Sequence, residues 1–216
     1  MSWLRWAFFA LFVRPLVLFF IGLKVRGMQH LPRRGPVLLV ANHNSHLDTM
    51  VLMSLFKLSA LPWLRATAAA DYWASGGWKA WFAEHIVGIV PVERKRGGVR
   101  RPVEEVLAPI SSALAEGKIV VFFPEGTRGE PERIQDFKAG LGLLARLNPD
   151  ARVVPVYLHG LGKAMPRGER LIVPHFCDVF IAEPMTYTGE VDSFVAAVQE
   201  RIEGMREGAG IDEVWE

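Results

Sequence analysis

Short, uninterrupted apolar runs alternate with helix-like stretches along most of the chain, and this alternation constrains the fold more than any other feature. The run at residues 37–41 reads Val-Leu-Leu-Val-Ala, which is typical of a β-strand buried on both faces. Similar runs lie at residues 86–92, 119–123 and 153–158. Helix-like stretches lie between and after them, at about residues 47–57, 75–84, 101–116, 137–147 and 191–206. The pattern predicts an α/β fold with a central, mostly parallel or mixed sheet flanked by helices.

Composition narrows the class of protein further. With 216 residues, half of them hydrophobic, the chain can build one domain with a sizeable core. The single cysteine, Cys177, excludes an intramolecular disulfide and a cysteine-based zinc site, and we expect it to be a small buried residue. The sequence contains neither the G-x-S-x-G motif of serine hydrolases nor the H-E-x-x-H motif of zinc peptidases. We therefore predict no metal ligands.

The N-terminal segment is apolar and basic. The first 47 residues contain six Lys or Arg and no acidic residue, which leaves a net charge of −4 on the remainder. Residues 3–23 are divided by Arg14-Pro15 into two apolar stretches, neither of which reaches the ~20 residues of a membrane span. A central arginine costs roughly 2.5–3.5 kcal/mol on insertion, and a proline kinks a helix.

We therefore expect an N-terminal interfacial helical hairpin, in which two short helices lie in the membrane interface with their basic groups toward the lipid headgroups. A single transmembrane span is the alternative. The corresponding domain division is residues 1–24 for the membrane-docking helices and residues 25–216 for the α/β domain.

A histidine and an aspartate follow the first predicted strand. His43 and Asp48 would lie on different faces of one regular helix, because five residues correspond to about 500°. A turn between strand and helix brings them together, so that Asp48 fixes the imidazole tautomer and the other ring nitrogen acts as a general base. The competing interpretation is a helix capping box, Ser45-x-x-Asp48.

Basic groups follow two later strands. Arg94 begins a stretch with five Lys or Arg in eight positions and with glycines, which is either an anion site or a solvated loop. The strand at 119–123 runs into the turn 124–128, Pro-Glu-Gly-Thr-Arg, where α/β folds place ligands. We expect Glu125 to pair with Arg128, either to aim Arg128 at a phosphate or as a surface ion pair. Lys138 near a helix start is disfavoured by the helix dipole unless an anion also lies there.

Together these motifs resemble one family, the glycerolipid acyltransferases. Residues 42–48, Asn-His-Asn-Ser-His-Leu-Asp, resemble the family's H-x4-D block. Residues 88–94, 122–129 and 153–160 resemble its second, third and fourth blocks, in the same order. The resemblance covers about residues 25–185, and the chain is similar to lysophospholipid (1-acylglycerol-3-phosphate) acyltransferases of the PlsC type.

The resemblance implies how the chain works. His43, oriented by Asp48, takes the proton of an acceptor hydroxyl, and the oxygen attacks an acyl thioester without a covalent enzyme intermediate. Asn42 shapes the turn that holds His43. Backbone amides near the turn from Glu125 to Arg128, which includes Gly126 and Thr127, serve the oxyanion, and Arg94, Arg128 and Lys138 bind the acceptor's phosphate. It implies no cofactor and no metal; the co-substrate is acyl-CoA or acyl carrier protein, and the location is the cytoplasmic face of the inner or plasma membrane.

The sequence departs from the family at one cation. Many phosphate-using members carry a lysine between the first two blocks, and Ala69 stands at that position here. The expected acceptor is 1-acylglycerol-3-phosphate, giving phosphatidic acid. A lysolipid with a larger headgroup, or a lyso-aminolipid, is the alternative, and an acyl thioesterase is a third possibility that the cations near Arg94 argue against, because water needs no anion site.

Overall fold

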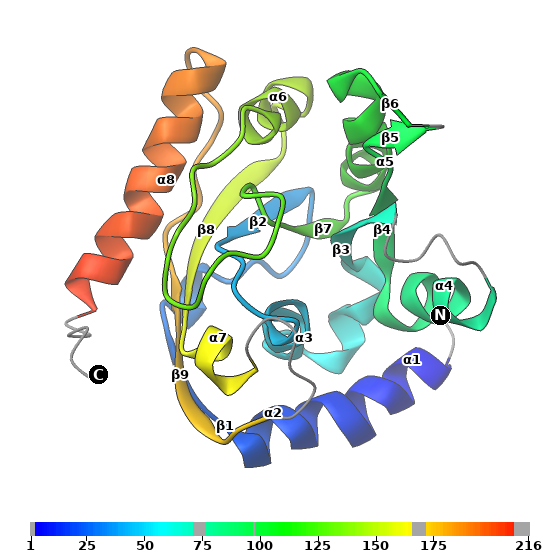
Figure 1. The fold of residues 1–216 in the computed structure, drawn as a ribbon, viewed down its shortest axis with the longest axis vertical. Coiled ribbons are helices and arrows are strands. Elements are labelled where there is room, and N and C mark those ends of the chain that lie inside the picture. Colours follow the sequence, from blue (N-terminus) through cyan, green and yellow to red (C-terminus); the bar gives the residue numbers. More distant parts are fainter. Residues whose placement is uncertain (1–2, 71–76, 97, 166–171, 210–216) are drawn as a thin grey trace.

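A mixed sheet of seven strands forms the centre of the molecule (Figure 1). This computed structural model describes residues 3–70, 77–96, 98–165 and 172–209. The strand order is β1-β9-β8-β2-β7-β3-β4, and neighbouring strands are parallel except for β8 and β9, which are antiparallel. The predicted α/β class with a mixed sheet is therefore confirmed. The strands are β1 (Ile21–Arg26), β2 (Val37–Ala41), β3 (Leu64–Ala69), β4 (Ile89–Val92), β7 (Ile119–Phe122), β8 (Arg152–His159) and β9 (His175–Ile181), with a separate antiparallel hairpin of β5 (Lys95–Arg96) and β6 (Val99–Arg100).

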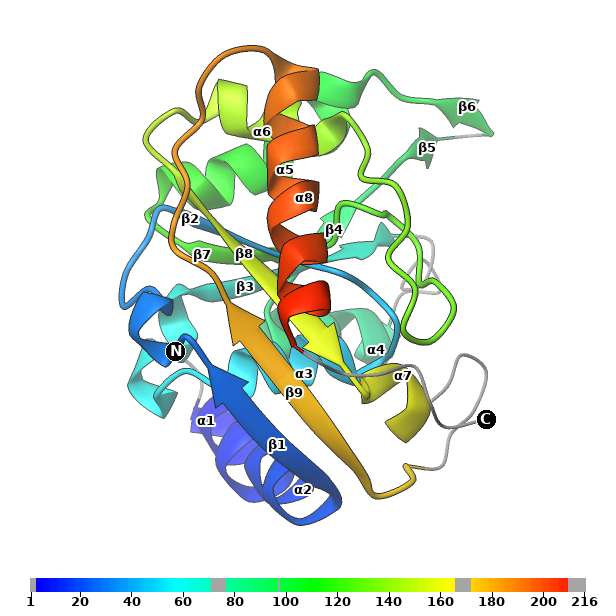
Figure 2. The same cartoon turned by 90° about the vertical axis from the view of Figure 1, so that its left-hand side faces the viewer.

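Helices cover both faces of the sheet. One face packs against α5 (Val103–Ala115), α6 (Gly140–Leu147) and α8 (Val191–Gly208); Figure 2 shows α8 lying across it. The other face packs against α3 (Leu47–Ser54), α7 (Leu161–Ala164) and the N-terminal helix. The remaining elements are α4 (Gly77–Phe82), its π-helical continuation η5 (Ala83–Val87), and the 3-10 turns η2 (Met28–His30) and η3 (Leu58–Trp63).

The strand β2 explains why its sequence is a continuous apolar run. Leu39 and its same-face neighbours Val37 and Ala41 belong to the core on the α3 side, whereas Leu38 and Val40 belong to the core on the α8 side. Because both faces of this central strand are covered, the alternation that marks a half-exposed strand is absent from it.

The N-terminal segment is one continuous helix rather than the predicted hairpin. It consists of α1 (Trp3–Phe8), the π-helical turn η1 (Phe9–Val13) and α2 (Arg14–Phe20). Pro15 lies in the first turn of α2, directly after the π-helical turn, and the Arg14 N–H donates to Phe9 O, five residues back. A π-helical turn re-satisfies backbone groups at such a proline, and the helix therefore continues through it.

One face of this helix is buried in the domain, which corrects the expected orientation of its basic groups. Phe9, Val13 and Val17 recur every four residues and enter the core. Arg5 is only 4% exposed and donates hydrogen bonds to Leu64 O and Val87 O, both at 3.0 Å. Arg14 donates to Phe56 O at 2.8 Å. Both guanidinium groups satisfy carbonyls of the domain instead of facing lipid headgroups.

The helix also remains apolar outside. Among the described residues, the segment Trp3–Phe20 is the one helix long and apolar enough to cross a membrane by length and composition. The residue after it, Ile21, begins β1, so the proposed domain boundary at residue 24 falls inside a strand of the central sheet.

The apolar runs in the sequence did not predict three of the seven strands in the sheet. β1 follows an apolar helix without a break in hydrophobicity, and we expected its residues to continue the helix. β3 and β9 include polar and small residues such as Arg65, Thr67 and Asp178. Their apolar content is too low for a continuous run, so tertiary pairing rather than local sequence makes them strands. Of the predicted helix at 75–84, residues 75 and 76 lie outside the described residues.

Candidate active site

The candidate residues lie at one edge of the sheet. His43 follows the end of β2, Glu125 follows β7, Arg94 follows β4, and Ala69 ends β3. These four strands are parallel, so their carboxyl ends meet at the same edge. Segments that lie 25 to 80 residues apart are thereby brought together at the place where open α/β sheets bind ligands.

His43 and Asp48 form a hydrogen-bonded pair in the turn between β2 and α3. His43 Nδ1 lies 2.8 Å from Asp48 Oδ2, and the aspartate side chain is 1% exposed against 20% for the histidine. A carboxylate can only accept, so Nδ1 carries the proton of this hydrogen bond, and in the neutral imidazole Nε2 then has the free lone pair. This is the arrangement that a general base requires.

The same aspartate oxygen also closes the turn. Asp48 Oδ2 accepts from the backbone N–H groups of Asn44 and Ser45, each at 2.8 Å. The Ser45 hydroxyl in turn accepts from Leu47 N–H at 3.2 Å. The Asp48 carboxylate thus accepts from Ser45 N–H, as in a capping box, while the N-cap residue of α3 is His46, whose side chain makes no cap hydrogen bond.

Glu125 lies beneath the histidine. Its side chain is fully buried, and Oε1 accepts from the His43 backbone N–H at 3.0 Å. Burial, and to a smaller extent the nearby Asp48, raise the pKa of Glu125 to about 8, although hydrogen bonds from the backbone of His43 and Gln135 oppose the rise. Glu125 thus supports the turn that carries His43 and does not itself reach the open edge.

Two further side chains fix the position of His43. The Phe123 ring stacks on the imidazole with centroids 4.0 Å apart and an interplanar angle of 16°. Asn42 is 1% exposed, donates to Leu158 O at 2.9 Å and accepts from Leu158 N–H at 2.7 Å. Asn42 therefore ties the end of β2 to β8. Sequence reasoning missed Phe123, although an aromatic residue directly before the charged turn is a usable signal.

Two cations gather over the turn after β7. Arg94 Nη2 donates to Gly126 O at 2.8 Å. Gly126 has φ +77°, and a Cβ built there would lie 2.9 Å from Lys138 Nζ and 3.0 Å from Arg94 Nη2. A side chain at position 126 would therefore displace both cations, which explains the glycine by packing as well as by backbone conformation. Thr127 follows on the exposed side of the turn.

Arg128 does not pair with Glu125 as expected. Its Nη1 contacts His46 Nε2 instead, because Glu125 points inward to the His43 backbone. Burial lowers the pKa of His46, with nearby Arg128 and His43 lowering it further and Asp48 opposing them. His46 thus connects the H-x4-D turn to the turn after β7.

The basic residues of the stretch that begins at Arg94 have different partners. Arg101 forms ion pairs with Glu93 at 2.8 Å and with Glu105 at 3.1 Å, so it completes a surface network rather than an anion site. Lys95 and Arg96 form β5, and Gly97 lies outside the described residues. Arg94 is the member of this stretch that reaches the turn after β7.

Glu132, a carboxylate that the sequence analysis did not identify, supports the site through its hydrogen bonds. Glu132 Oε1 accepts from Gly160 N–H at 3.0 Å, and His159 Nδ1 lies 2.5 Å from Glu132 Oε2. With its amide oriented to satisfy both neighbours, Asn44 donates to His43 O and accepts from Glu132 N–H, each at 3.1 Å. Glu132 has φ 62°, a conformation that non-glycine residues seldom adopt. No local pattern in the sequence predicts this role for Glu132.

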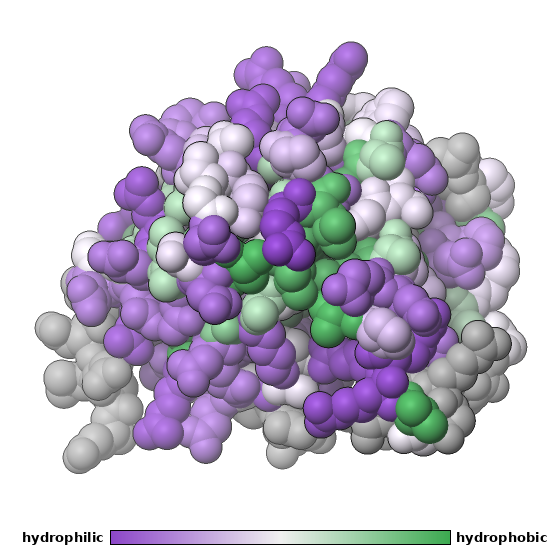
Figure 3. Space-filling view, turned by 90° about the horizontal axis from the view of Figure 1, so that it is seen from above, coloured by the Kyte–Doolittle hydropathy of each residue, from purple (hydrophilic) through white to green (hydrophobic). Residues whose placement is uncertain are grey.

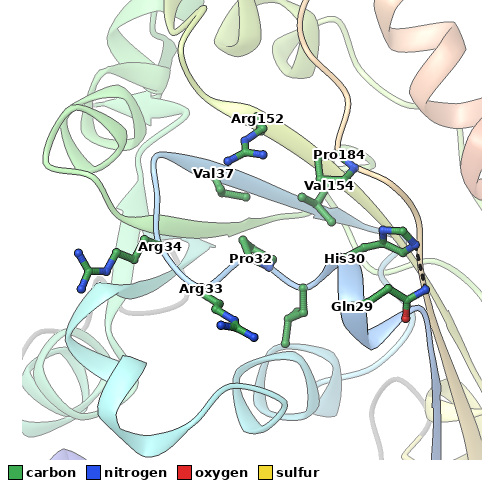
Figure 4. Close-up of a pocket in the computed structure, with 10 residues that line it drawn as sticks. Gln29, His30, Pro32, Arg33, Arg34, Val37, Arg152, Val154 and Pro184 are labelled. Carbon is green, nitrogen blue, oxygen red and sulfur yellow. Dashed lines mark hydrogen bonds between the residues drawn. The ribbon is translucent and has the colours of Figure 1, made fainter.

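A cavity and a free cysteine lie outside the candidate active site. A cavity of about 670 Å³ opens at the amino ends of β2 and β8, the edge opposite His43, and includes Arg33, Arg34 and Arg152. Figure 4 shows that these arginines do not converge, since Arg34 points away from the others. Within the described ranges, no group of three or more His, Cys, Asp or Glu side chains is arranged to hold a metal ion. Cys177 is buried and free.

Comparison with known proteins gives relatives of one kind. The chain is 33% identical over 157 residues to a chloroplast 1-acyl-sn-glycerol-3-phosphate acyltransferase of Arabidopsis thaliana, covering 72% of this chain and 41% of that protein. It is 34% identical over 142 residues to a lyso-ornithine lipid O-acyltransferase of Rhizobium meliloti, covering 65% and 45%. The chain thus spans less than half the length of either relative.

The fold has a solved counterpart. The crystal structure of PlsC, the 1-acyl-sn-glycerophosphate acyltransferase of Thermotoga maritima, superposes with a TM-score of 0.73 at 19% identity, over 96% of this chain and 79% of that one. The profile of the family described as Acyltransferase matches residues 22–159. That segment runs from β1 to the end of β8 and contains the His43–Asp48 pair and the turn after β7, and the chain is accordingly a member of the acyltransferase family.

Proposed function

We propose that this protein transfers a fatty acyl group from an acyl thioester to the hydroxyl of a lysophospholipid, with 1-acylglycerol-3-phosphate as acceptor and phosphatidic acid as product. The observation that carries the proposal is the His43–Asp48 hydrogen bond through Nδ1, at the sheet edge where Arg94 and Lys138 gather. A general base and an anion site at one edge are what an acceptor with both a hydroxyl and a phosphate requires. The acyltransferases among its relatives support the same reaction.

His43 acts as the general base in this scheme. Nε2 takes the proton of the acceptor hydroxyl while the hydroxyl oxygen attacks the thioester carbonyl carbon. The tetrahedral intermediate collapses, the C–S bond breaks, and the leaving thiolate takes the proton from Nε2. Asp48 stabilises the imidazolium that exists between the two proton transfers. The carrier of the thioester is coenzyme A or acyl carrier protein.

We assign the oxyanion to the backbone N–H groups of Thr127 and Arg128. The amides on either side of them are already used, since Gly126 N–H donates to Phe123 O at 3.1 Å and Gly129 N–H donates to His43 O at 2.8 Å. Among the contacts of the described residues, none engages the two N–H groups between them. Backbone donors held by a constrained turn stabilise developing charge without reorganisation.

Arg94 and Lys138 are the proposed phosphate ligands. Both are exposed, and both approach the turn at Gly126. A planar guanidinium forms two parallel hydrogen bonds with a phosphate, and a lysine adds a compact charge. Arg128 contacts His46, and in the proposal it supports this site from the side.

A specific observation favours a second acceptor class, the lyso-aminolipids. Ala69 ends β3 at the carboxyl edge and is exposed there, so the position that carries a lysine in many phosphate-using members has no charge here. A relative at 34% identity is named as a lyso-ornithine lipid O-acyltransferase. This second candidate shares the chemistry at His43 and differs in the acceptor headgroup.

The test is a direct product assay. Purified protein is incubated with acyl-CoA or acyl carrier protein thioester and a panel of lysolipids, and the products are identified by mass spectrometry. Phosphatidic acid as the main product supports the leading acceptor, whereas acylation of a lyso-aminolipid alone replaces it with the second. Release of free fatty acid at equal rates with and without acceptor contradicts acyl transfer and indicates a thioesterase.

Variants at the anion site distinguish the two acceptors. Arg94→Lys keeps the charge but loses the planar fork, so kcat/KM for a phosphate acceptor falls by about tenfold, equivalent to about 1.4 kcal/mol, while the KM for the thioester changes less. Arg100→Lys, on the exposed hairpin strand β6, is the matched control. Ala69→Lys preserves or raises activity with 1-acylglycerol-3-phosphate and lowers activity with a bulkier natural headgroup. An unchanged kcat/KM in Arg94→Lys contradicts the assigned site.

We further propose that the protein works at a membrane surface, at the cytoplasmic face of the inner or plasma membrane. The N-terminal helix supports this location, because Leu11 and Phe12 are each 66% exposed on its outer face and Phe19 is 83% exposed. Alkaline carbonate that extracts the intact protein from membranes supports the interfacial position, and resistance to extraction supports a transmembrane span.

A further inference from the structure

A second helix places large apolar side chains beside the N-terminal helix. On α4, Trp78 is 72% exposed and Trp81 is 48% exposed. They lie three residues apart and therefore on one side of that helix. Figure 1 shows α4 next to α1, at the end of the long N-terminal helix that runs along the lower edge of the molecule. Segments more than 60 residues apart in sequence thus contribute to one side of the protein.

Aromatic contacts join the two helices. The Phe12 and Phe8 rings stack with centroids 6.1 Å apart, and Phe8 meets Phe82 of α4 edge-on at 5.2 Å. Phe82 follows Trp81 directly and lies one helical turn after Trp78. The exposed rings of the two helices are therefore neighbours of one aromatic cluster and not isolated surface residues.

Arg5 locks this arrangement to the domain. One of its guanidinium nitrogens donates to Leu64 O at the start of β3 and also to Val87 O at the end of η5, the continuation of α4. Gly88 makes room for it, because a Cβ there would lie 2.5 Å from Arg5 Nη2. The N-terminal helix and the α4–η5 segment are consequently held in one fixed relation to the sheet.

We propose that α4 is a second membrane-contacting segment, and that Trp78 and Trp81 enter the bilayer interface beside the N-terminal helix. Tryptophan prefers this interface because its ring is apolar and its N–H still reaches water or headgroups. Lys79, exposed between the two tryptophans, matches anionic headgroups. Seen from the side opposite the N-terminal helix, the surface is mostly hydrophilic around a smaller apolar area (Figure 3).

The docking surface deepens the proposed function and rests on it for its purpose. α4 lies in the connection between β3 and β4, and both strands end at the edge that carries the candidate active site. Two attachment points fix the height of that edge above the membrane, whereas a single helix would leave the domain free to rotate about it. The acceptor hydroxyl would then meet His43 at a constant depth.

The experiment compares two double variants of the full chain. Trp78→Glu/Trp81→Glu places charges on the proposed surface. Val99→Glu/Leu147→Glu places the same charges at side chains of matched exposure, 71% and 49%, on β6 and α6 away from the N-terminal helix. Binding to vesicles of phosphatidylcholine and phosphatidylglycerol is measured by co-sedimentation, and melting temperatures verify folding. Partitioning falls by roughly tenfold or more for the tryptophan variant and stays near wild type for the control.

A second measurement uses conservative changes that keep the fold. Brominated lipids quench tryptophan fluorescence at the interface. Trp3 and Trp6 are exposed on the N-terminal helix and are replaced by Phe in a common background, so that the quenching in that background reports on α4. Adding Trp78→Phe/Trp81→Phe to this background removes most of the remaining quenchable signal. Wild-type partitioning in the glutamate variant, or undiminished quenching in the phenylalanine variant, overturns the proposal. Wild-type protein that self-associates through α4, with vesicle binding unaffected by either double variant, assigns the surface to a second copy of the chain and overturns it as well.

The acyl-transfer assay separates this proposal from the proposed function. With a short-chain lysolipid that is monomeric in solution, the tryptophan variant keeps its kcat, and with the long-chain acceptor in vesicles it loses most of its activity. Equal activity of variant and wild type on vesicles contradicts the docking surface. If the wild type acylates neither acceptor, the proposed function fails, while the loss of vesicle binding in the tryptophan variant still decides the docking surface.

Discussion

At the scale of single residues, the candidate site consists of groups that each serve more than one partner. One oxygen of Asp48 accepts from an imidazole and from two backbone N–H groups, and Glu125 is buried under the same turn. A turn that satisfies its own polar groups in this way is preorganised, because the histidine needs no rearrangement before it takes a proton. The backbone of the turn that accepts support from Asp48 and Glu125 therefore has little freedom to move.

The first residue-scale prediction concerns the His43–Asp48 pair. His43→Ala removes the general base and lowers kcat/KM by about 10²–10⁴-fold, while the melting temperature changes little because His43 is partly exposed. Asp48→Asn lowers it on a similar scale by favouring the wrong tautomer. His30→Ala, at the opposite edge of the sheet, is the control. Near-normal turnover in a folded His43→Ala protein would mean that another group is the base.

The second residue-scale prediction concerns pH and stability. The pKa of Glu125 is raised from its ordinary 4.5 to about 8, so between these values the native state holds a proton that the unfolded state releases. The unfolding free energy therefore falls as pH rises through this window. Above the window, Glu125 causes no further decrease. Glu125→Gln keeps the hydrogen bond from His43 N–H and removes the titration. Urea unfolding between pH 5 and 9 checks this, and parallel profiles for variant and wild type would show that Glu125 is ionised in the native state.

At the scale of elements, the N-terminal helix is two-sided. Its inner side enters the core with a four-residue spacing, and its outer side is aromatic and exposed. The four-residue spacing of Phe9, Val13 and Val17 is present in the sequence. It does not stand out there, because the residues on the other side of the helix are also apolar. A helix of this kind is part of the domain and also its proposed surface for lipid.

The element-scale prediction is that Arg5 holds this helix in place. Arg5→Met keeps much of the aliphatic bulk but removes the donor that Arg5 supplies to Val87 O, at about 1–3 kcal/mol. Leu64 O loses one of its two side-chain donors and keeps the hydrogen bond from Arg65 Nη1 at 2.9 Å. Chemical unfolding in detergent micelles measures the loss. Arg33→Met, an exposed arginine of the same N-terminal region, is the matched control and changes the unfolding free energy by less than about 0.5 kcal/mol. Equal effects of the two changes would show that Arg5 is not a structural link.

At the scale of the whole molecule, the sheet, rather than any one segment, creates the site. The order β2, β7, β3, β4 brings the ends of these parallel strands to one edge, and β8 and β9 extend the sheet to β1. The N-terminal helix therefore precedes an edge strand of the same sheet. Its removal is a change to the domain itself.

The whole-molecule prediction is that deletion of residues 1–23 prevents folding instead of giving a soluble, membrane-free enzyme. The deletion removes Phe9, Val13, Val17 and Ile21 from the core and half of β1. Burial of four such side chains contributes roughly 6–12 kcal/mol, which is comparable with the 5–15 kcal/mol that stabilises a domain. Circular dichroism melts in detergent decide the matter. A cooperative transition near the wild-type temperature would show that the helix is a separate appendage.

The sequence by itself determined the class of fold and the position of the turn that holds His43 and Asp48. Continuous apolar runs predict buried strands, and the runs at 37–41, 119–123 and 153–158 lie in the sheet as β2, β7 and β8. Of the run at 86–92, residues 89–92 form the edge strand β4 and the first two residues end η5. The H-x4-D spacing with a strand before it specifies a turn, because no regular helix joins His43 to Asp48. These are local properties, and periodicity and spacing report local properties well.

Only the tertiary structure decided the partners of the charged groups and the strands at the margins. Glu125 and Arg128 are three residues apart, yet one is buried against the His43 backbone and the other contacts His46, because the sheet puts two turns that are about 80 residues apart side by side. β1 and β9 are strands since each completes the other's ladder. Hydrogen-bond partners between distant segments depend on how strands are ordered, and no local pattern in a single sequence encodes that order.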